Sequence, residues 1–383
     1  MYGKSLLVLA VIGLAFAGCT AEVEPKKTPG QTPDAPAELP KLTIGHVGHD
    51  HQIALYVAAL QPKLLKERGG VWLKEKKPRE VYDLMDGDEA VAELHLTKVG
   101  GGSNMPAAME RGEIDVGLGG IPAVVFFVDK GAPFRVLSPL NVDGDMLLLR
   151  PDIPVDDWAG FVQYVKESKK PVKIGYKAPV AVAKLVFMGA LDHEGIPHSE
   201  AAPPEGGVEL VHLKGAKNTV PLLESGAVDG VVINEPFGSI AESKNVGKIV
   251  SLLGDLPPDG RWKNHPCCCV CATQATIDGH REVLKKLLAM MYNTTKFIQE
   301  SPEAAGMLAA EWTKKPMAVE LESVPNIVYL MEPGEAYRKG LETWFGIMNE
   351  VGKFKGAIKG RSFEEAFELC HDLTLINEVI EGR

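Results

Sequence analysis

Three features are scarce in this sequence of 383 residues: excess positive charge, long apolar runs and dispersed cysteines. A formal net charge of −10 argues against nucleic acid as a partner, because phosphate backbones are bound through clustered Lys and Arg. Beyond the amino terminus, no segment is long and apolar enough to cross a membrane. Four of the six cysteines lie within 267–271. Neighbouring cysteines in one strand reach disulfide geometry poorly, so a disulfide framework is excluded.

The amino terminus contains a short apolar run that is typical of a secretory signal. Lys4 precedes the stretch Leu6–Phe16, which is too short to span a bilayer core of about 30 Å as a helix. The run ends in Gly18 and Cys19, which resembles the lipobox of bacterial lipoproteins, in which that cysteine is acylated. Phe16 stands where the lipobox usually has Leu. An ordinary signal peptide with an incidental cysteine is the alternative.

These features predict a signal peptide at 1–18, lipidation of Cys19 and a flexible Pro-rich tether at 19–40. Prolines recur through the tether among Thr, Lys, Glu and Asp, a composition that cannot bury a core and stays extended. Two or more acyl chains hold a protein stably on a membrane, whereas one chain binds marginally. We therefore expect an extracytoplasmic protein, lipid-anchored to the cell membrane and facing the periplasm if the cell is Gram-negative.

The remaining chain alternates between strands and helices, which predicts α/β lobes whose mostly parallel sheets are flanked by helices. The first helix is expected at 53–68. Strands are expected at 41–47, 93–99, 114–118, 134–140, 146–149, 172–175 and 208–213. Residues 69–92 interrupt this alternation and predict an inserted hairpin with Asp86-Gly87 at its turn. We interpret this insertion as a surface elaboration.

Two segments, ERGEIDVGLGGIP and ESGAVDGVVINEP, repeat one pattern: an acidic residue, a Gly-containing turn, an Asp and a buried strand that ends at a cleft. The repetition predicts two lobes, and the chain is long enough for both. Lobe 1 is predicted to comprise 41–140 and 239–383, and lobe 2 to comprise 141–238. The chain should cross between them near 139–144 and 235–238.

The segment GGGSNMPAAMERGEIDVGLGGIPAVVFFVDKGAPFRVLSPL is similar to the first lobe of the nitrate, taurine and sulfonate class of ABC solute-binding proteins, which includes the thiamine-pyrimidine (NMT1-like) proteins. The resemblance covers the chain from about Leu42, apart from the insertion. It implies the type II periplasmic binding protein fold, a small solute in the inter-lobe cleft, and an ABC permease with its ATPase as partners.

A second resemblance concerns Pro266–Cys271, which is similar to the CCC-x-C motif of the eukaryotic thiamine-pyrimidine synthases. Those enzymes have the same two-lobed fold, depend on iron, and consume pyridoxal phosphate and one of their own histidines. Aligned through EIDVGL, the lysine that holds pyridoxal phosphate falls at Gly119 and the consumed histidine falls at Ala123. Neither residue can perform that chemistry, so we expect no enzyme activity of this type.

Ligands of parallel sheets bind outside the carboxyl ends of the strands, so the loops that follow strands hold the site candidates. The imidazoles after the first strand suit an anion, a heterocycle or a transition metal, and equally a solvated loop. The two glycine-rich segments offer free backbone N–H groups at helix starts, which attract anionic groups, although Ser and Asn are also simple N-caps. These candidates are His49, Asp50, His51, Gly102, Ser103, Asn104, Gly119, Gly120 and Ile121.

In the second lobe, the candidates are Lys177, Asn234 and Glu235. Lys177 follows a strand and would offer a cation to an anionic ligand, although a solvated lysine is the plain alternative. Asn234 and Glu235 end a strand before Pro236. They are expected either to contact the ligand or to have a purely structural role at the hinge between the lobes.

The cysteine-rich strand offers a further site. Alternation along a strand puts Cys267, Cys269 and Cys271 on one face and Cys268 on the other. Soft thiolates suit iron, zinc or copper, so these four cysteines are candidate ligands of iron or another transition metal. Packing beside a ligand and an inert buried strand are the alternatives.

The sequence therefore favours a lipid-anchored solute-binding component of an ABC importer. Its ligand is expected to be a small organic anion or heterocycle, similar to a sulfonate, nitrate, taurine or a thiamine pyrimidine. The alternatives are an iron-dependent enzyme that uses the cysteine strand, and a metal-binding protein.

Overall fold

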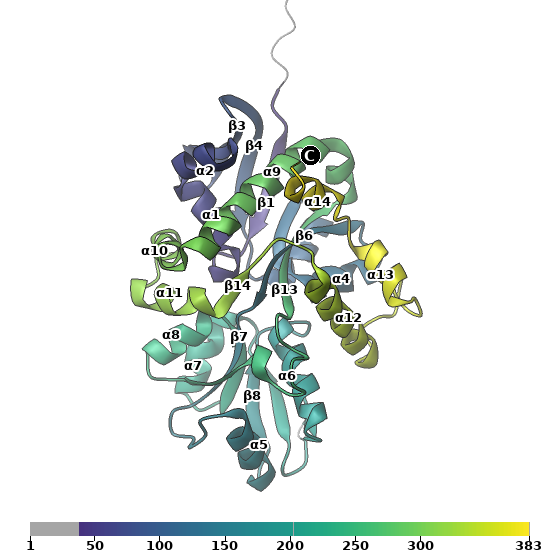
Figure 1. The fold of residues 1–383 in the computed structure, drawn as a ribbon. Helices are drawn as coiled ribbons and strands as arrows, with labels where there is room; N and C mark the ends of the chain where they lie inside the picture. The colour runs from purple at the N-terminus through teal and green to yellow at the C-terminus, as the bar shows by residue number, and fades with distance from the viewer. Residues whose placement is uncertain (1–37, 202, 383) are drawn as a thin grey trace, which may run out of the picture. The chain divides into compact units, whose positions relative to one another are not determined.

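The computed structural model describes residues 38–201 and 203–382, which fold around two β-sheets. The predictions of a signal peptide, of lipidation at Cys19 and of most of the tether fall on 1–37 and lie outside the described residues. Among the described helices, none has the length and apolar character of a membrane span. Figure 1 shows the larger sheet in the upper part of residues 39–382 and the smaller sheet in the lower part.

The larger sheet has eight strands in the order β14-β6-β13-β5-β1-β4-β3-β2. Only β1 with β4 and β1 with β5 pair in parallel, and every other neighbouring pair is antiparallel. Its strands are β1 (Lys41–His46), β2 (Val71–Lys77), β3 (Val81–Asp86), β4 (Glu89–Lys98), β5 (Val116–Gly120), β6 (Phe134–Asp143), β13 (Pro266–Thr273) and β14 (Ile327–Tyr329).

The smaller sheet has six strands in the order β12-β7-β11-β8-β10-β9. The run from β11 to β9 is parallel, whereas β7 is antiparallel to both of its neighbours. Its strands are β7 (Asp145–Leu149), β8 (Val172–Tyr176), β9 (His198–Ser199), β10 (Val208–His212), β11 (Gly230–Asn234) and β12 (Lys248–Leu252).

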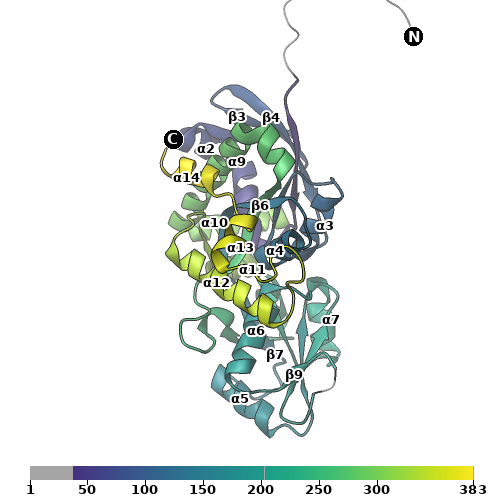
Figure 2. The same cartoon turned by 90° about the vertical axis from the view of Figure 1, so that its right-hand side faces the viewer.

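Helices cover both faces of each sheet. Around the larger sheet, α1 packs on α9 and α3 packs on α4, and Figure 2 shows α9 and α3 on opposite sides of β6. In the smaller sheet, α6 and α7 flank β7 from opposite sides in the same view. The α-helices are α1 (Ile53–Leu60), α2 (Pro62–Gly69), α3 (Met105–Glu110), α4 (Ile121–Asp129), α5 (Trp158–Glu167), α6 (Val182–His193), α7 (Thr219–Glu224), α8 (Phe237–Ser243), α9 (Gln274–Glu300), α10 (Pro302–Thr313), α11 (Met317–Ser323), α12 (Glu335–Glu350), α13 (Phe363–Cys370) and α14 (Thr374–Ile380).

Several sequence predictions need correction. The larger sheet is mixed rather than mostly parallel, because the insertion adds the antiparallel strands β2 and β3 at one edge and β13 returns antiparallel beside β5. The predicted hairpin exists, but its turn is Gly87-Asp88, one residue later than expected. The helix expected at 53–68 is two helices, because Pro62 begins the second one at a position where its missing N–H costs nothing.

The crossings between the two sheets also differ in part from the prediction. Gly144, with φ +83°, separates β6 of the larger sheet from β7 of the smaller one, at the end of the predicted range. The return occurs between Leu252 and Pro266, not at 235–238. The reason is that β12 pairs with the free edge of β7 and keeps the chain in the smaller sheet for one more strand.

Candidate functional site

A cavity of about 30 Å³ lies where loops of the larger sheet meet loops of the smaller one. The loops follow the carboxyl ends of β1, β4 and β5 on one side and of β8 and β11 on the other. The lining residues are His49, His51, Gln52, Gly102, Ser103, Gly120, Lys177, Val180, Ala181, Val182, Asn234, Cys267 and Cys268.

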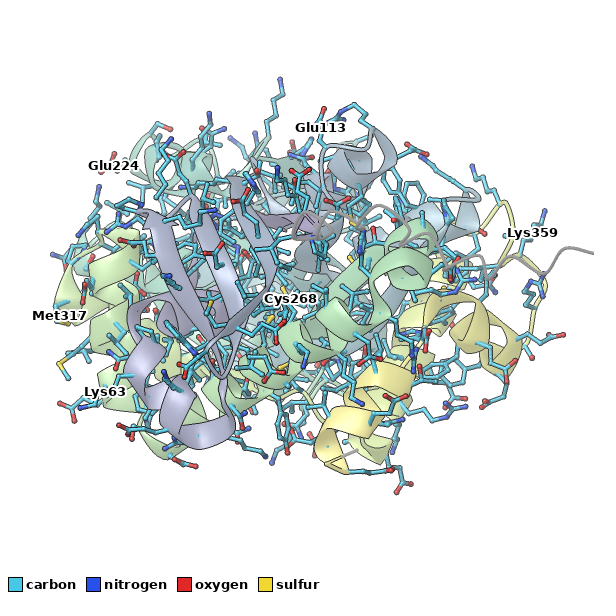
Figure 3. The ribbon with its side chains drawn as sticks, turned by 90° about the horizontal axis from the view of Figure 1, so that it is seen from above. Lys63, Glu113, Glu224, Cys268, Met317 and Lys359 are labelled. Carbon is cyan, nitrogen blue, oxygen red and sulfur yellow. The ribbon has the colours of Figure 1, made fainter. Side chains whose placement is uncertain are left out.

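The cysteine strand reaches this cavity with its amino end only. Since β13 runs antiparallel to β5, Cys268 lies beside Gly120 at the carboxyl edge of the parallel strands. Cys269 and Cys271 lie deeper, where their Sγ atoms contact the carbonyl oxygens of Gly119 at 3.6 Å and Gly117 at 3.3 Å. Figure 3 shows Cys268 near the middle of the molecule.

The predicted alternation of the cysteines is wrong at the start of the strand. The Sγ atoms of Cys267 and Cys268 lie 3.8 Å apart, and both contact His51 Nδ1, at 3.3 Å and 3.9 Å. Register shifts on both sides of Cys268 in the pairing with β6 break the two-residue period. A bulge of this kind sets consecutive side chains toward the same side of a strand.

His51 is held in place from three directions. Its Nε2 lies 3.3 Å from Gly144 O, and its Nδ1 lies 3.2 Å from Asn141 Oδ1. The side-chain amide of Asn141 also donates to His51 O. Residues of β6 and of the crossing thus fix this imidazole, which is only 1% exposed, beside the two thiols.

The two thiols at the cavity differ in acidity. The hydrogen bond from Cys267, with help from nearby His51, lowers the pKa of Cys268 to about 5 despite its burial. The same hydrogen bond and burial raise the pKa of Cys267.

Lys177 supplies the positive charge that borders the cavity from the smaller sheet. Its ammonium group donates to Asn234 Oδ1, and Asn234 Nδ2 donates in turn to Glu235 O at 2.6 Å. On the opposite side, burial, the imidazole of His51 and the ammonium of Lys177 lower the pKa of His49, so that His49 is neutral at pH 7.

Two helices begin at the cavity without a side-chain cap. Gly120 precedes α4, and Ala181 precedes α6, and neither offers a side-chain acceptor to the first turn. Both of these residues line the cavity. Uncapped amino ends leave backbone N–H donors and the positive end of the helix dipole for a ligand.

An ion-paired cluster lies directly behind the cysteines. His265 is 3% exposed and sits between Asp143 Oδ1 at 2.9 Å and Asp145 Oδ2 at 3.3 Å. The Oδ2 atom of Asp145 also lies 3.7 Å from Cys267 Sγ, whereas its Oδ1 has no hydrogen-bond partner although it is buried. This cluster connects the two crossings with the floor of the cavity.

Some predicted site residues lie elsewhere. Asp50 turns away from the cavity and accepts from Ser323 near α11, where burial and the carboxylate of Glu320 raise its pKa. Glu235 is buried outside the cavity lining, where its carboxylate accepts from Ser239 and Asn326. The other predicted residues outside the lining are Asn104, which is exposed, and Gly119, Ile121, Cys269 and Cys271, which are buried.

Sequence reasoning missed several residues of this site. Gln52 fixes the histidine loop, because its Oε1 accepts from Val47 N at 2.7 Å and its amide donates to Leu118 O. The segment 180–182 lines the cavity because it follows β8 and leads into α6, which begins at Val182. Asn141 and Asp145 flank the first crossing, and their polar character within a run of apolar residues was an available signal.

A pyridoxal phosphate site of the synthase type does not fit these residues. Gly119 belongs to β5, where it has no side chain to form an imine, and a Cβ there would lie only 3.0 Å from Gly102 O. Ala123 lies on α4 and is 1% exposed. Neither position therefore offers the lysine or the histidine that the synthases use with pyridoxal phosphate.

The comparisons with known proteins agree with this architecture. The model of the NMT1-like family matches residues 35–313. The chain belongs to the NMT1-like family. It is also 34% identical over 146 residues to an uncharacterised protein of Methanocaldococcus jannaschii, a match that covers 38% of this chain and 92% of that protein.

Solved structures show the same fold at low sequence identity. The ligand-binding component of an ABC-type import system from Staphylococcus aureus, with zinc bound, superposes with a TM-score of 0.68 at 14% identity and covers 89% of this chain and 99% of that one. The periplasmic nitrate-binding protein of Synechocystis PCC 6803 superposes with a TM-score of 0.66 at 15% identity, and the match covers 90% of this chain and 89% of that one. This NMT1-like protein therefore has the α/β periplasmic binding protein fold.

Proposed function

We propose that this NMT1-like protein is the extracytoplasmic, lipid-anchored solute-binding component of an ABC importer, and that its solute carries a small anionic group. The cavity between the two sheets carries this proposal. Loops from both sheets meet there, so closure of the lobes can enclose a ligand and opening can release it to a permease and its ATPase.

The polar groups around the cavity favour an anion. Lys177 and the uncapped amino ends of α4 and α6 converge on it, and the histidine at its edge is neutral. Helix amino ends bind carboxylate, sulfonate or phosphate groups through backbone N–H donors. Among the lining residues, imidazole is the sole aromatic ring, so a heterocycle would lack a larger stacking partner.

The small volume also limits the solute. The cavity is narrow in this structure, so a larger organic solute requires the lobes to open around the crossings. We therefore place the anionic group of the solute at the helix amino ends and the remainder of a larger solute in the opened cleft.

The test is a thermal-shift and calorimetric screen of the purified protein with nitrate, taurine, alkanesulfonates and thiamine pyrimidines. A ligand present at 100 times its Kd should stabilise the protein by about 2.7 kcal/mol. Lys177→Ala should weaken anion binding at least tenfold, because it removes the ammonium that borders the cavity. Lys173→Ala is the matched control, since this exposed lysine lies on β8 and outside the cavity.

Two outcomes would contradict the proposal. One is a folded protein that binds none of these anions with measurable affinity. The other is an equal loss of affinity in both lysine variants, which would show that binding depends on general charge and not on the cavity.

A further inference from the structure

The strongest feature that the anion-binding proposal leaves unused is the group of His51, Cys267 and Cys268. Among the described residues, these three are the set of potential metal ligands whose donor atoms all lie within 4.8 Å of one another. All three side chains are buried and all three line the cavity. A solute binder that used only Lys177 and the helix amino ends would have no need of two thiols beside an imidazole.

The distances within the group match the edges of a tetrahedral site. With metal bonds of about 2.3 Å to sulfur and about 2.0 Å to nitrogen, tetrahedral angles put two sulfurs about 3.8 Å apart and sulfur and nitrogen about 3.5 Å apart. The Sγ atoms of Cys267 and Cys268 are 3.8 Å apart. Their separations from His51 Nδ1 are 3.3 Å and 3.9 Å.

The surroundings of the imidazole support the same geometry. A histidine that ligates a metal usually donates its other ring N–H to a carbonyl or carboxylate, which fixes the tautomer. Here Nδ1 lies near both thiols and 3.2 Å from Asn141 Oδ1, a contact that a bound metal would replace, and Nε2 lies 3.3 Å from Gly144 O. The ring therefore already has the outer partner that a metal-bound imidazole requires.

The local charges also suit a divalent cation. Cysteine binds a metal as the thiolate, so a divalent ion held here would displace the thiol protons of Cys267 and Cys268. The carboxylate of Asp145, one oxygen of which has no partner, lies 3.7 Å from Cys267 Sγ. The two sulfurs and this carboxylate would thus place negative charge around a divalent ion once the thiol protons are displaced.

The two remaining cysteines of the strand do not belong to this group. Their Sγ atoms contact backbone carbonyls on β5, and Cys271 Sγ also lies 3.6 Å from Met109 Sδ. The strand is therefore not a four-thiolate unit. The bulge at Cys268 divides it into a pair that faces the cavity and a pair that is packed in the core.

We infer that His51 Nδ1, Cys267 Sγ and Cys268 Sγ hold one thiophilic divalent ion of the zinc type at the floor of the cavity. Three protein ligands leave the fourth tetrahedral position to water or to the anionic group of the solute, on the side that Lys177 borders. This inference deepens the proposed function, because it adds a metal to the same cavity.

The decisive experiment loads the full chain with Zn²⁺ after treatment with a chelator and a reductant. Bound zinc is measured by elemental analysis, and affinity by competition with a chromophoric chelator. We expect one zinc per chain. Cys268→Ser and His51→Gln should lower the affinity at least about 100-fold, beyond the 10–100-fold loss usual for an outer partner of a metal ligand.

Cys370→Ser is the matched control, because Cys370 is also a buried free thiol but lies on α13 outside the cavity. It should bind zinc as the unaltered protein does. Since a variant can fail to fold, Co²⁺ is added to the unaltered protein as a second measurement. Sulfur-to-cobalt charge-transfer absorption with strong ligand-field bands should appear, as expected for a tetrahedral site with thiolates.

Three results would overturn the inference. They are less than one zinc per folded chain, cobalt spectra without thiolate bands, or an equal loss of affinity in Cys271→Ser and Cys268→Ser. Anion binding by the chelator-treated protein is measured in parallel. If it persists while zinc does not bind, the metal site is refuted and the solute-binding proposal stands.

Discussion

Replacing His265 with Gln should destabilise the protein by about 3–5 kcal/mol at neutral pH, because the change leaves the buried Asp145 and the partly buried Asp143 without their shared cation. The imidazole is 3% exposed and lies between Asp143 and Asp145. It also joins the two crossings, since the backbone N–H groups of Asn264 and His265 donate to Asp143.

The expected size follows from the acidity of the imidazole. Burial alone would lower the pKa of His265, but the hydrogen bonds and charges of Asp143 and Asp145 outweigh it and raise the pKa to about 10. The difference from the ordinary 6.5, at 1.36 kcal/mol per pH unit, gives roughly 5 kcal/mol. This agrees in order of magnitude with the cost of breaking a buried ion pair.

The pH dependence has a definite sign. Because the folded pKa is raised, the stabilisation is fully present below pH 6.5 and is lost as the pH rises toward 10. Urea unfolding of the unaltered protein and of His265→Gln should therefore show a large difference in unfolding free energy at pH 6 and a small one near pH 10. A double variant that also carries Asp145→Asn should regain part of the loss.

A difference below about 1 kcal/mol at pH 6 would refute this reasoning, since that is the size of an exposed ion pair. So would a difference that is the same at pH 6 and pH 10. The first result would mean that the carboxylates are solvated without the imidazole. The second would mean that His265 stabilises the crossings through packing and not through charge.

Three further changes test caps and packing elsewhere in the fold. Ser362→Ala should cost about 1 kcal/mol in urea unfolding, because it removes the capping box of α13; no measurable change would contradict this. Asp129→Ala should lower the unfolding free energy by about 3 kcal/mol, because the Asp129 carboxylate accepts backbone N–H groups from 355–358. A similar loss in Asp129→Asn would show that the charge of the carboxylate matters. Gly117→Ala should lower the melting temperature, because a Cβ would lie 2.7 Å from the side chain of Met105, and an unchanged melting curve would show that this side chain moves freely.

The local sequence pattern was sufficient for much of the fold. The alternation of apolar strands with helices, and the glycines that end them, placed β1, β4, β5, β8 and β11 close to their observed positions. The loops that follow these strands supplied His49, His51, Gly102, Ser103, Gly120, Lys177 and Asn234, all of which line the cavity. This worked because the carboxyl ends of parallel strands meet at one edge whatever the details of packing.

Local pattern was insufficient where partners came from distant parts of the chain. Asp50 lies between two cavity histidines in sequence, yet it faces α11 because Ser323 and Lys315 lie there. The second crossing falls after β12 because the edge of β7 was free to pair. Neither Ser323 nor that edge can be recognised from the residues around Asp50 or Leu252.

The sequence by itself determined that this chain is an α/β protein with a repeated glycine turn before a buried strand, and with a cysteine-rich strand. It did so because apolar periodicity and glycine placement act over a few residues. Only the tertiary structure decided that Cys267 and Cys268 face the same cavity while Cys269 and Cys271 are packed in the core. That division depends on the antiparallel pairing of β13 with β5 and on a bulge against β6, which are contacts across more than a hundred residues.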